Sequence, residues 1–175
     1  LLVRGMDALV HVAEPFPTDN AVAQIDYLTR CTYNLCLAAA AEGVKRLIYL
    51  STLDLMTAYD THYLVNERWK PRPSTHAPVL AKHLGEFTCR EFAREHKLAV
   101  VVLRLGKVVR AEEVAGHPVD PLWVDERDVA QAVSLALTAD LPRWAIFHIG
   151  ADSSQARFSV ATAKRMLSYA PQYTF

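Results

Sequence analysis

Short apolar runs alternate along the chain with longer segments in which apolar residues recur every three or four positions. The runs occupy residues 7–13, 45–50, 99–103 and 144–149. The first of them, DALVHVA, is mostly apolar and ends near two prolines, which is typical of a strand that is buried on both faces of a parallel sheet. We therefore expect a strand at each run and helices in the longer segments between them.

The first long segment begins at about Asp19 and ends at Gly43. Its apolar residues are three or four positions apart, which places them on one face of a helix. Glycine often ends a helix because it tolerates the left-handed conformation that follows the last turn. We expect a helix over about 19–42. Its expected buried stripe comprises Val22, Ile25, Leu28, Leu35 and Ala39.

The second helix is expected between a loop over about 52–72 and the strand at 99–103. Ser74 or Thr75 can cap its first turn with a hydroxyl group, and the helix ends at about His96. Its expected buried stripe comprises Leu80, Leu84 and Phe87.

The third helix is expected to open at Asp125, in the segment WVDERDVAQAV, and to end near Ala139. Asp125 is a suitable N-cap, and Asp128 three residues later resembles the second member of a capping box. We prefer this capping role over a catalytic role for the two aspartates. A short fourth helix is expected over 160–167, after the last strand.

Short strands that alternate with helices of about twelve or more residues are typical of βαβ crossovers. We therefore predict a doubly wound, Rossmann-like α/β fold, in which helices cover both faces of a parallel sheet. The 175 residues, 51% of them hydrophobic, suit one ordinary core. We treat 1–175 as one domain, incomplete at its N-terminus, with small C-terminal elements on the substrate side from about residue 107.

Composition excludes several classes of partner. The formal net charge is zero and the isoelectric point is about 7.2, so no strong field is available to bind nucleic acid or an anionic membrane. No apolar run approaches the roughly 18 residues that can span a bilayer. Three cysteines without a C-x-x-C pair fit neither a disulfide framework nor a metal site, so we expect a soluble protein of a reducing cytoplasm.

Ligands of doubly wound folds bind where the strands end at their carboxyl edge. Ser51 and Thr52 follow the strand at 45–50, and Arg104 and Gly106 follow the strand at 99–103. These four residues are therefore candidates for a ligand site. A simpler interpretation is that the two hydroxyls form hydrogen bonds with the backbone of a turn. The glycine would then be present because it allows a backbone conformation that other residues avoid.

Four segments, in this order, carry a resemblance to a known family: GVKRLIYLST, LAKHLGE, VVVLRLG and WVDERDVAQAV. They resemble segments of the extended short-chain dehydrogenases/reductases, which include NAD-dependent sugar epimerases, dehydratases and uronate dehydrogenases. The resemblance implies NAD or NADP as cofactor and a small sugar or uronate-like substrate. It also implies a homodimer formed through the helices at about 19–42 and 74–96.

In that family a serine or threonine holds the substrate oxygen, a tyrosine transfers the proton, and a lysine four residues later binds the nicotinamide ribose. Thr52, or else Ser51, takes the first role here, and Lys82 takes the last. Pro78 stands in the tyrosine's place; it suits the first turn of a helix but cannot move a proton. Losing a positioned acid or base lowers a rate by about 10² to 10⁴. Further implied cofactor contacts are Ala13, Arg104 and Gly106.

Tyr59, Tyr63 and His76 are the alternative sources of the missing proton. Loop tyrosines usually cover apolar surface, and His76, six residues before Lys82, does not share its helical face. His83, next to Lys82, does not share it either. Lys82 itself has a simpler interpretation, as a helix lysine with its charge in water.

The six glycines are dispersed, so the glycine-rich dinucleotide fingerprint of the family is not found. GMDALVHVAEP resembles the family's fourth strand, so we expect the fingerprint portion to precede Leu1 and to cover the edge of the sheet, unless a partner does. Two functions fit this sequence. One is an NAD(P)-dependent epimerase/dehydratase-like oxidoreductase, and the other is a catalytically inactive nucleotide- or metabolite-binding member of the same fold.

Overall fold

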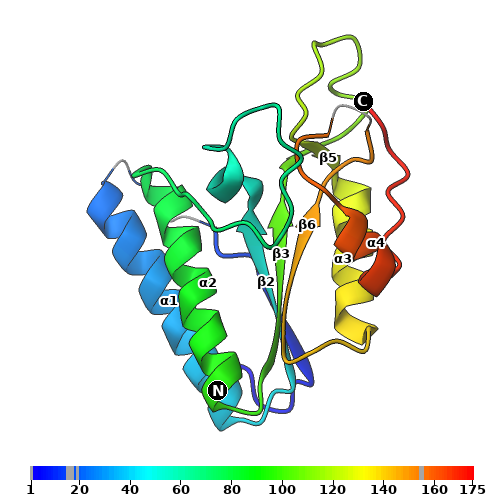
Figure 1. Ribbon diagram of the computed structural model, residues 1–175. Helices are drawn as coiled ribbons and strands as arrows, with labels where there is room; N and C mark the ends of the chain where they lie inside the picture. Colours follow the sequence, from blue (N-terminus) through cyan, green and yellow to red (C-terminus); the bar gives the residue numbers. More distant parts are fainter. Residues whose placement is uncertain (1, 15–17, 19, 154–155) are drawn as a thin grey trace.

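The computed structural model describes residues 2–14, 18, 20–153 and 156–175 (Figure 1). Its main sheet has four parallel strands in the order β1-β2-β3-β6. A small second sheet pairs β4 with β5, also in parallel. The strands of the main sheet are β1 (Ala8–His11), β2 (Arg46–Thr52), β3 (Ala99–Leu105) and β6 (Trp144–Ile149), and those of the second are β4 (Lys107–Val109) and β5 (Trp123–Asp125).

Helices cover both faces of the main sheet, which confirms the predicted doubly wound fold. Figure 1 shows one pair of helices on one side of the strands and a second pair on the other. The first pair is α1 (Ala21–Ala41) with α2 (Ala77–Glu95), and the second is α3 (Glu126–Thr138) with α4 (Ala161–Leu167). A 3-10 helix, η1 (Leu53–Met56), directly follows β2.

The apolar runs of the sequence correspond to the strands because both faces of the sheet are buried. In β2, Leu47 and Tyr49 pack toward α1 and α2, whereas Ile48 packs in the cluster beneath α3 and α4. In β3, Val102 and Leu103 divide between the two faces in the same way. A strand that is dry on both faces needs apolar residues in succession, and this requirement produced the pattern in the sequence.

Helix α1 agrees with its prediction in most respects. The Asn20 side chain caps it by accepting a hydrogen bond from the Ala23 amide, and Gly43 follows its end with a positive φ of 73°. Of the expected stripe, Leu28 and Ala39 are buried. Val22 is 75% exposed, so its assignment to the core was wrong.

Helix α2 buries a different face from the one expected. Leu84 and Phe87 are 38% and 49% exposed, whereas the small residues Ala81, Gly85 and Cys89 are buried. The reason is the close approach of β2, because a Cβ atom at Gly85 would lie 2.0 Å from the Tyr49 hydroxyl oxygen. Small residues on α2 therefore face the sheet, and larger apolar residues are partly exposed to solvent.

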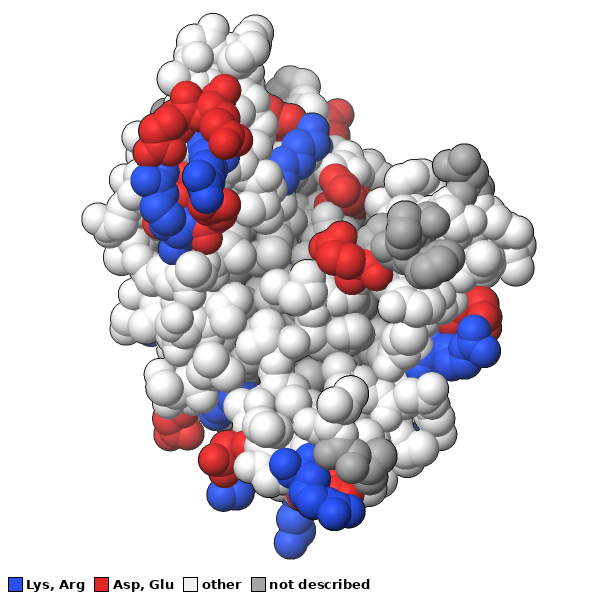
Figure 2. Space-filling view, turned by 180° about the vertical axis from the view of Figure 1, so that it is seen from behind, with Lys and Arg blue, Asp and Glu red and all other residues white. Residues whose placement is uncertain are grey.

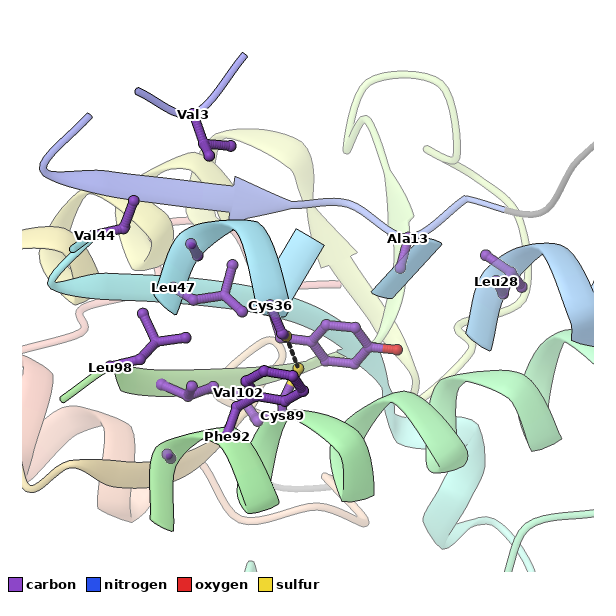
Figure 3. Packing of buried hydrophobic residues seen from close by; sticks show 14 of the residues in the cluster. Val3, Ala13, Leu28, Cys36, Val44, Leu47, Cys89, Phe92, Leu98 and Val102 are labelled. Carbon is purple, nitrogen blue, oxygen red and sulfur yellow. Dashed lines mark hydrogen bonds between the residues drawn. The ribbon is translucent and has the colours of Figure 1, made fainter. Parts of the chain in front are cut away.

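A pair of cysteines packs in the interface between α1 and α2. Figure 3 shows Cys36 of α1 and Cys89 of α2 directed at each other beside Leu47, Phe92 and Val102. Their sulfur atoms are 3.8 Å apart, and both side chains are fully buried. The hydrogen bond with Cys36, followed by burial, raises the pKa of the Cys89 thiol, which favours two neutral thiols acting as small apolar groups.

The predicted helix caps were right for α3 and wrong for α2. Asp125 caps α3 by accepting from the Arg127 amide. Asp128 does not complete a capping box; it accepts hydrogen bonds from the amides of Gln172 and Tyr173 and so holds the C-terminal segment. At α2 the cap position is His76, which makes no side-chain capping bond.

Among the described residues, β1 pairs with a strand on one side only. Val10 and Val12 at this edge are 41% and 48% exposed. A neighbouring strand that covers this edge stays a prediction. Figure 2 shows the molecule from behind, where charged side chains gather in small groups that contain both signs. Within the described ranges, every helix is too short or too polar to cross a membrane.

Candidate active site at the carboxyl edge of the sheet

A cavity of about 310 Å³ opens where β1, β2 and β3 end. Its position is the carboxyl edge at which doubly wound folds bind ligands. Lys82 of α2 reaches into it, and its polar walls come from strand ends. The lining residues are Val12, Glu14, Leu50, Ser51, Thr52, Lys82, Leu105, Gly106, Val108 and Val129.

Lys82 bridges the ends of two strands. Its Nζ donates hydrogen bonds to the carbonyl oxygens of Val12, just beyond β1, and Leu50 in β2, at 2.7 and 2.8 Å. Burial lowers the pKa of Lys82 to about 8, and the carboxylate of Glu14 partly opposes this shift. Lys82 is therefore a partly buried cation held at the cavity and not a lysine with its charge in bulk water.

Ser51 and Thr52 point to different partners, as successive residues of a strand do. The Ser51 hydroxyl donates to Glu86 Oε1 at 2.6 Å, inside the protein. The Thr52 Oγ1 accepts from the Asp54 amide at 3.1 Å and so caps η1. This bond uses a lone pair of Thr52, which leaves its hydroxyl hydrogen to serve a ligand in the cavity.

Arg104, a candidate from the sequence, does not line this cavity. Its guanidinium forms a paired salt bridge with the carboxylate of Glu86, with Nε and Nη2 at 2.9 and 2.7 Å from the two oxygens. Arg104 and Glu86 are 2% and 5% exposed. The arginine therefore ties β3 to α2 and, through Glu86, fixes the Ser51 hydroxyl. Its side chain projects toward α2 and away from the cavity, so a contact of Arg104 with the cofactor stays a prediction.

Gly106 lines the cavity, but close packing explains why this position holds a glycine. A Cβ atom at this position would lie 2.0 Å from the backbone oxygen of Leu122. The neighbouring Lys107 amide donates to that same oxygen at 2.8 Å. Gly106 therefore permits the close approach of the Leu122 backbone, which favours the simpler interpretation made from the sequence.

Ala13 is buried just after β1 and has a positive φ of 55°, a conformation that costs a non-glycine residue roughly 1–2 kcal/mol. Figure 3 shows it near Leu28, among the residues of the core under α1. It is adjacent to the cavity residues Val12 and Glu14 in the chain but does not line the cavity itself. The structure thus brings Lys82, Ser51, Thr52 and Gly106 together, without Ala13 and Arg104.

The alternative proton donors lie elsewhere. The Tyr59 hydroxyl donates to the Lys70 carbonyl at 2.7 Å, and the rings of Tyr59 and Tyr63 pack against Trp69. His76 is exposed at the start of α2, and His83 packs edge-on against Phe87. Pro78 occupies the first turn of α2. Of the ionisable side chains in the described part of the chain, Lys82 and Glu14 line the cavity.

Glu86 and Glu14 were not predicted from the sequence. Glu86 could have been noticed, because it lies four residues after Lys82 in LAKHLGE and so shares its face of the helix. A glutamate on the buried face of a helix requires a partner, and the arginine of VVVLRLG was the available one. Glu14 gave no such signal, since it is one acidic residue in a loop.

These features define a class of protein. The doubly wound parallel sheet, with a lysine held at its carboxyl edge beside two hydroxyl residues, is a Rossmann-like arrangement. Residues 2–119 match the NAD dependent epimerase/dehydratase family. The chain belongs to this family.

Known relatives agree with this assignment. The chain is 28% identical over 161 residues to the L-arabinose 1-dehydrogenase (NAD(P)(+)) of Haloferax volcanii, an alignment that covers 79% of this chain and 63% of the relative. A mutated uronate dehydrogenase has a similar structure, with a TM-score of 0.82, 19% identity, and coverage of 99% of this chain and 62% of that one. This chain thus spans less than two thirds of either protein.

A UDP-glucuronic acid 4-epimerase from Bacillus cereus, solved in complex with NAD, is also similar. Its TM-score is 0.77 and its identity 16%, with coverage of 99% of this chain and 70% of the epimerase. At such identities the two solved structures establish the Rossmann-like fold.

The residues present fit one end of a nicotinamide dinucleotide. The Lys82 ammonium has three N–H groups and uses two on carbonyl oxygens, so the third can bind a ribose hydroxyl. Thr52 offers a further donor at the same cavity. The six glycines of the chain are dispersed, so a glycine-rich turn for the pyrophosphate is not among the described residues.

Proposed function

We propose that this chain forms the nicotinamide and substrate side of an NAD(P)-dependent oxidoreductase or epimerase that acts on a sugar or uronate-like substrate. The observation that carries the proposal is the position of Lys82, whose Nζ bridges the Val12 and Leu50 carbonyls at the cavity. The names of the relatives, which act on arabinose, uronates and UDP-glucuronic acid, support the substrate class.

In this proposal each cavity residue has one role. Lys82 presents its third position, the one not bonded to a carbonyl, to the bound ligands, and Thr52 donates to the substrate oxygen that reacts. Ser51, held by Glu86, lines the cavity beside Thr52 and fixes the end of β2. The dinucleotide, when bound in its oxidised form, would supply the hydride acceptor for the substrate carbon. The apolar residues Leu50, Leu105 and Val129 of the cavity limit the access of water to that carbon.

A second function is a protein that binds a nucleotide or metabolite and has lost the reaction. The observation that favours it is Pro78, which stands in the first turn of α2, four residues before Lys82, and has no ionisable group. Under this alternative the cavity still binds the dinucleotide, but the substrate proton has no acceptor.

The two functions are separated by binding and turnover measurements on the full-length protein. We expect NAD(H) or NADP(H) to bind, detected by calorimetry, and the nicotinamide absorbance to change with a member of a panel of aldoses and uronic acids. Lys82→Ala should weaken dinucleotide binding at least tenfold, because it removes a charged donor. The control is Lys45→Ala, at a largely exposed lysine before β2.

Binding of the dinucleotide without turnover of any sugar in the panel would reject the first function and support the second. Absence of dinucleotide binding in a folded protein would reject both. Equal affinity of the wild type and Lys82→Ala would reject the role of Lys82 in either of them.

We also propose a homodimer formed through α1 and α2. These helices pack beside each other on one face of the sheet and leave large apolar side chains in solvent (Figure 1). On α1 these are Val22, Tyr33 and Leu37, and on α2 they are Leu84 and Phe87. Burying such a surface against a second copy would stabilise the pair by the hydrophobic effect.

Sedimentation velocity at micromolar concentration tests the dimer. We expect the wild type to sediment as a dimer and Leu84→Glu to shift it toward monomer, because a charge would be buried in the interface. Val119→Glu, at an exposed loop valine outside both helices, is the control and should remain dimeric. A wild type that is monomeric throughout would contradict the proposal.

A further inference from the structure

We propose that Lys82 Nζ is itself the group that exchanges the proton with the substrate hydroxyl, in the role that the resemblance assigns to a tyrosine. This inference rests on the proposed function and names the acid and base of its reaction. It begins from the contents of the cavity. Lys82 and Glu14 are the ionisable side chains that line it in the described part of the chain, and Pro78 adds none.

Glu14 is less suited to the role than Lys82. It is an exposed residue beyond the end of β1, and its carboxylate acts on Lys82 by favouring the ammonium form. The tyrosines and histidines considered from the sequence have other contacts and do not line the cavity. Lys82 is therefore the one group there that is both held in place by hydrogen bonds and able to gain or lose a proton.

The hydrogen bonds of Lys82 suit both of its protonation states. An ammonium nitrogen has three N–H groups, whereas a neutral amine has two N–H groups and one lone pair. Two positions around Nζ are taken by the carbonyl oxygens of Val12 and Leu50, at 2.7 and 2.8 Å. Either state can keep both bonds. The proton that differs between the states therefore occupies the third position, which is the one open to the cavity.

The surrounding charges leave both states accessible near neutral pH. Burial lowers the pKa of Lys82 to about 8, against the opposing effect of Glu14. His11 in β1 has its pKa lowered to about 4, first by burial and then by Lys82, so it is neutral at pH 7. Burial raises the pKa of Tyr49, whose hydroxyl donates to the Lys82 carbonyl, so this phenol is neutral too. An acid or base works best when its pKa is near the working pH.

The proton step balances as follows in the direction of oxidation. The O–H bond of the substrate breaks while an N–H bond forms at the neutral Lys82 Nζ, and the electron pair of the O–H bond becomes part of the new C=O bond. The electrons of the adjacent C–H bond leave as the hydride taken up by oxidised NAD or NADP. The ammonium then releases its proton to water. In reduction, the ammonium donates the proton to the carbonyl oxygen.

The first test needs no turnover. Lysines of the folded, full-length protein are labelled with acetic anhydride at a series of pH values, and the extent of labelling at each lysine is measured by mass spectrometry. We expect Lys82 to label with a midpoint near pH 8 and to be protected by NAD(H) or NADP(H). Lys97, exposed after α2, is the internal reference. A midpoint for Lys82 above pH 10 would overturn the proposal.

The second test uses the reaction. Oxidation needs the neutral amine, so its kcat should rise about tenfold per pH unit up to about pH 8 and then level off, because one proton is lost. The kcat for reduction should fall over the same range. Lys82→Arg keeps the charge and the donors but does not release a proton, so it should retain dinucleotide binding and lose about 10² to 10⁴ in kcat.

Chemical rescue separates proton transfer from a positioning role. In Lys82→Ala, added methylamine should restore part of the turnover, and amines of different pKa should give rates that follow their basicity. Turnover by Lys82→Arg within threefold of wild type would overturn the role of Lys82 alone. A wild type that binds the dinucleotide without any turnover would overturn the proposed function together with this role.

Discussion

Arg104→Met should lower the free energy of unfolding by about 3–5 kcal/mol, because it leaves the buried carboxylate of Glu86 without its cation. Arg104 and Glu86 are almost completely buried and joined by two short hydrogen bonds. Once the guanidinium is lost, the hydrogen-bond partner that remains for this carboxylate among the described residues is the Ser51 hydroxyl. One neutral donor cannot offset the loss of hydration of a buried charge.

Urea denaturation followed by circular dichroism measures this effect. Arg94→Met, on the helix that carries Glu86, is the matched control, because Arg94 is 68% exposed in its ion pair with Glu91 and should change stability by less than about 1 kcal/mol. In the double variant Glu86→Leu with Arg104→Met, most of the lost stability should return, since neither charge remains buried alone. A cost of Arg104→Met no larger than that of Arg94→Met would contradict this account.

Gly106→Ala should destabilise the protein by about 3 kcal/mol, at the upper end of the usual cost of overpacking. The new Cβ atom would meet the backbone oxygen of Leu122 at 2.0 Å, and no side-chain rotation can relieve a collision with backbone. Retreat of Leu122 would stretch its hydrogen bond with the Lys107 amide, and retreat of Gly106 would stretch the bond of its own amide to Ile149. The strain therefore falls on the end of β3.

Gly150→Ala is the control, since Gly150 follows β6 as Gly106 follows β3. The nearest atom to its new Cβ would be Val160 Cγ1 at 4.0 Å, an ordinary contact, so the change should stay within about 0.5 kcal/mol. Because Gly106 also lines the cavity, we expect weaker dinucleotide binding in Gly106→Ala than in Gly150→Ala. Equal stability of the two variants in urea would show that the Leu122 segment can move away without cost.

Much of the fold could be predicted because its strongest requirement is local in sequence. Strands covered on both faces must be apolar at successive positions, and this fixed β2, β3 and β6 to within a few residues. The cap at Asp125 was likewise visible, since it joins a side chain to a backbone amide two residues away. Asp128 was misjudged because its partners, Gln172 and Tyr173, are more than forty residues distant.

The candidate site was predicted only in part. Placing Lys82 and Thr52 at one edge of the sheet needs no more than the parallel direction of the strands and the resemblance of their segments. Arg104 also lies near the end of a strand at that site, but nearness to the strand end does not bring a side chain into the cavity. Like Val102 two residues before it, Arg104 projects toward the face covered by α1 and α2, where Glu86 holds it.

By itself, the sequence determined the order of helices and strands, the doubly wound class and the family, because apolar spacing and short motifs act over a few residues. The tertiary structure alone decided which face of α2 is buried, since the Tyr49 ring leaves room for Gly85 and for no larger residue. It also decided that Nζ of Lys82 lies against the Val12 carbonyl, 70 residues away in the chain. Such contacts depend on distances between elements that are remote in sequence, and those distances are set by the packing of the whole core.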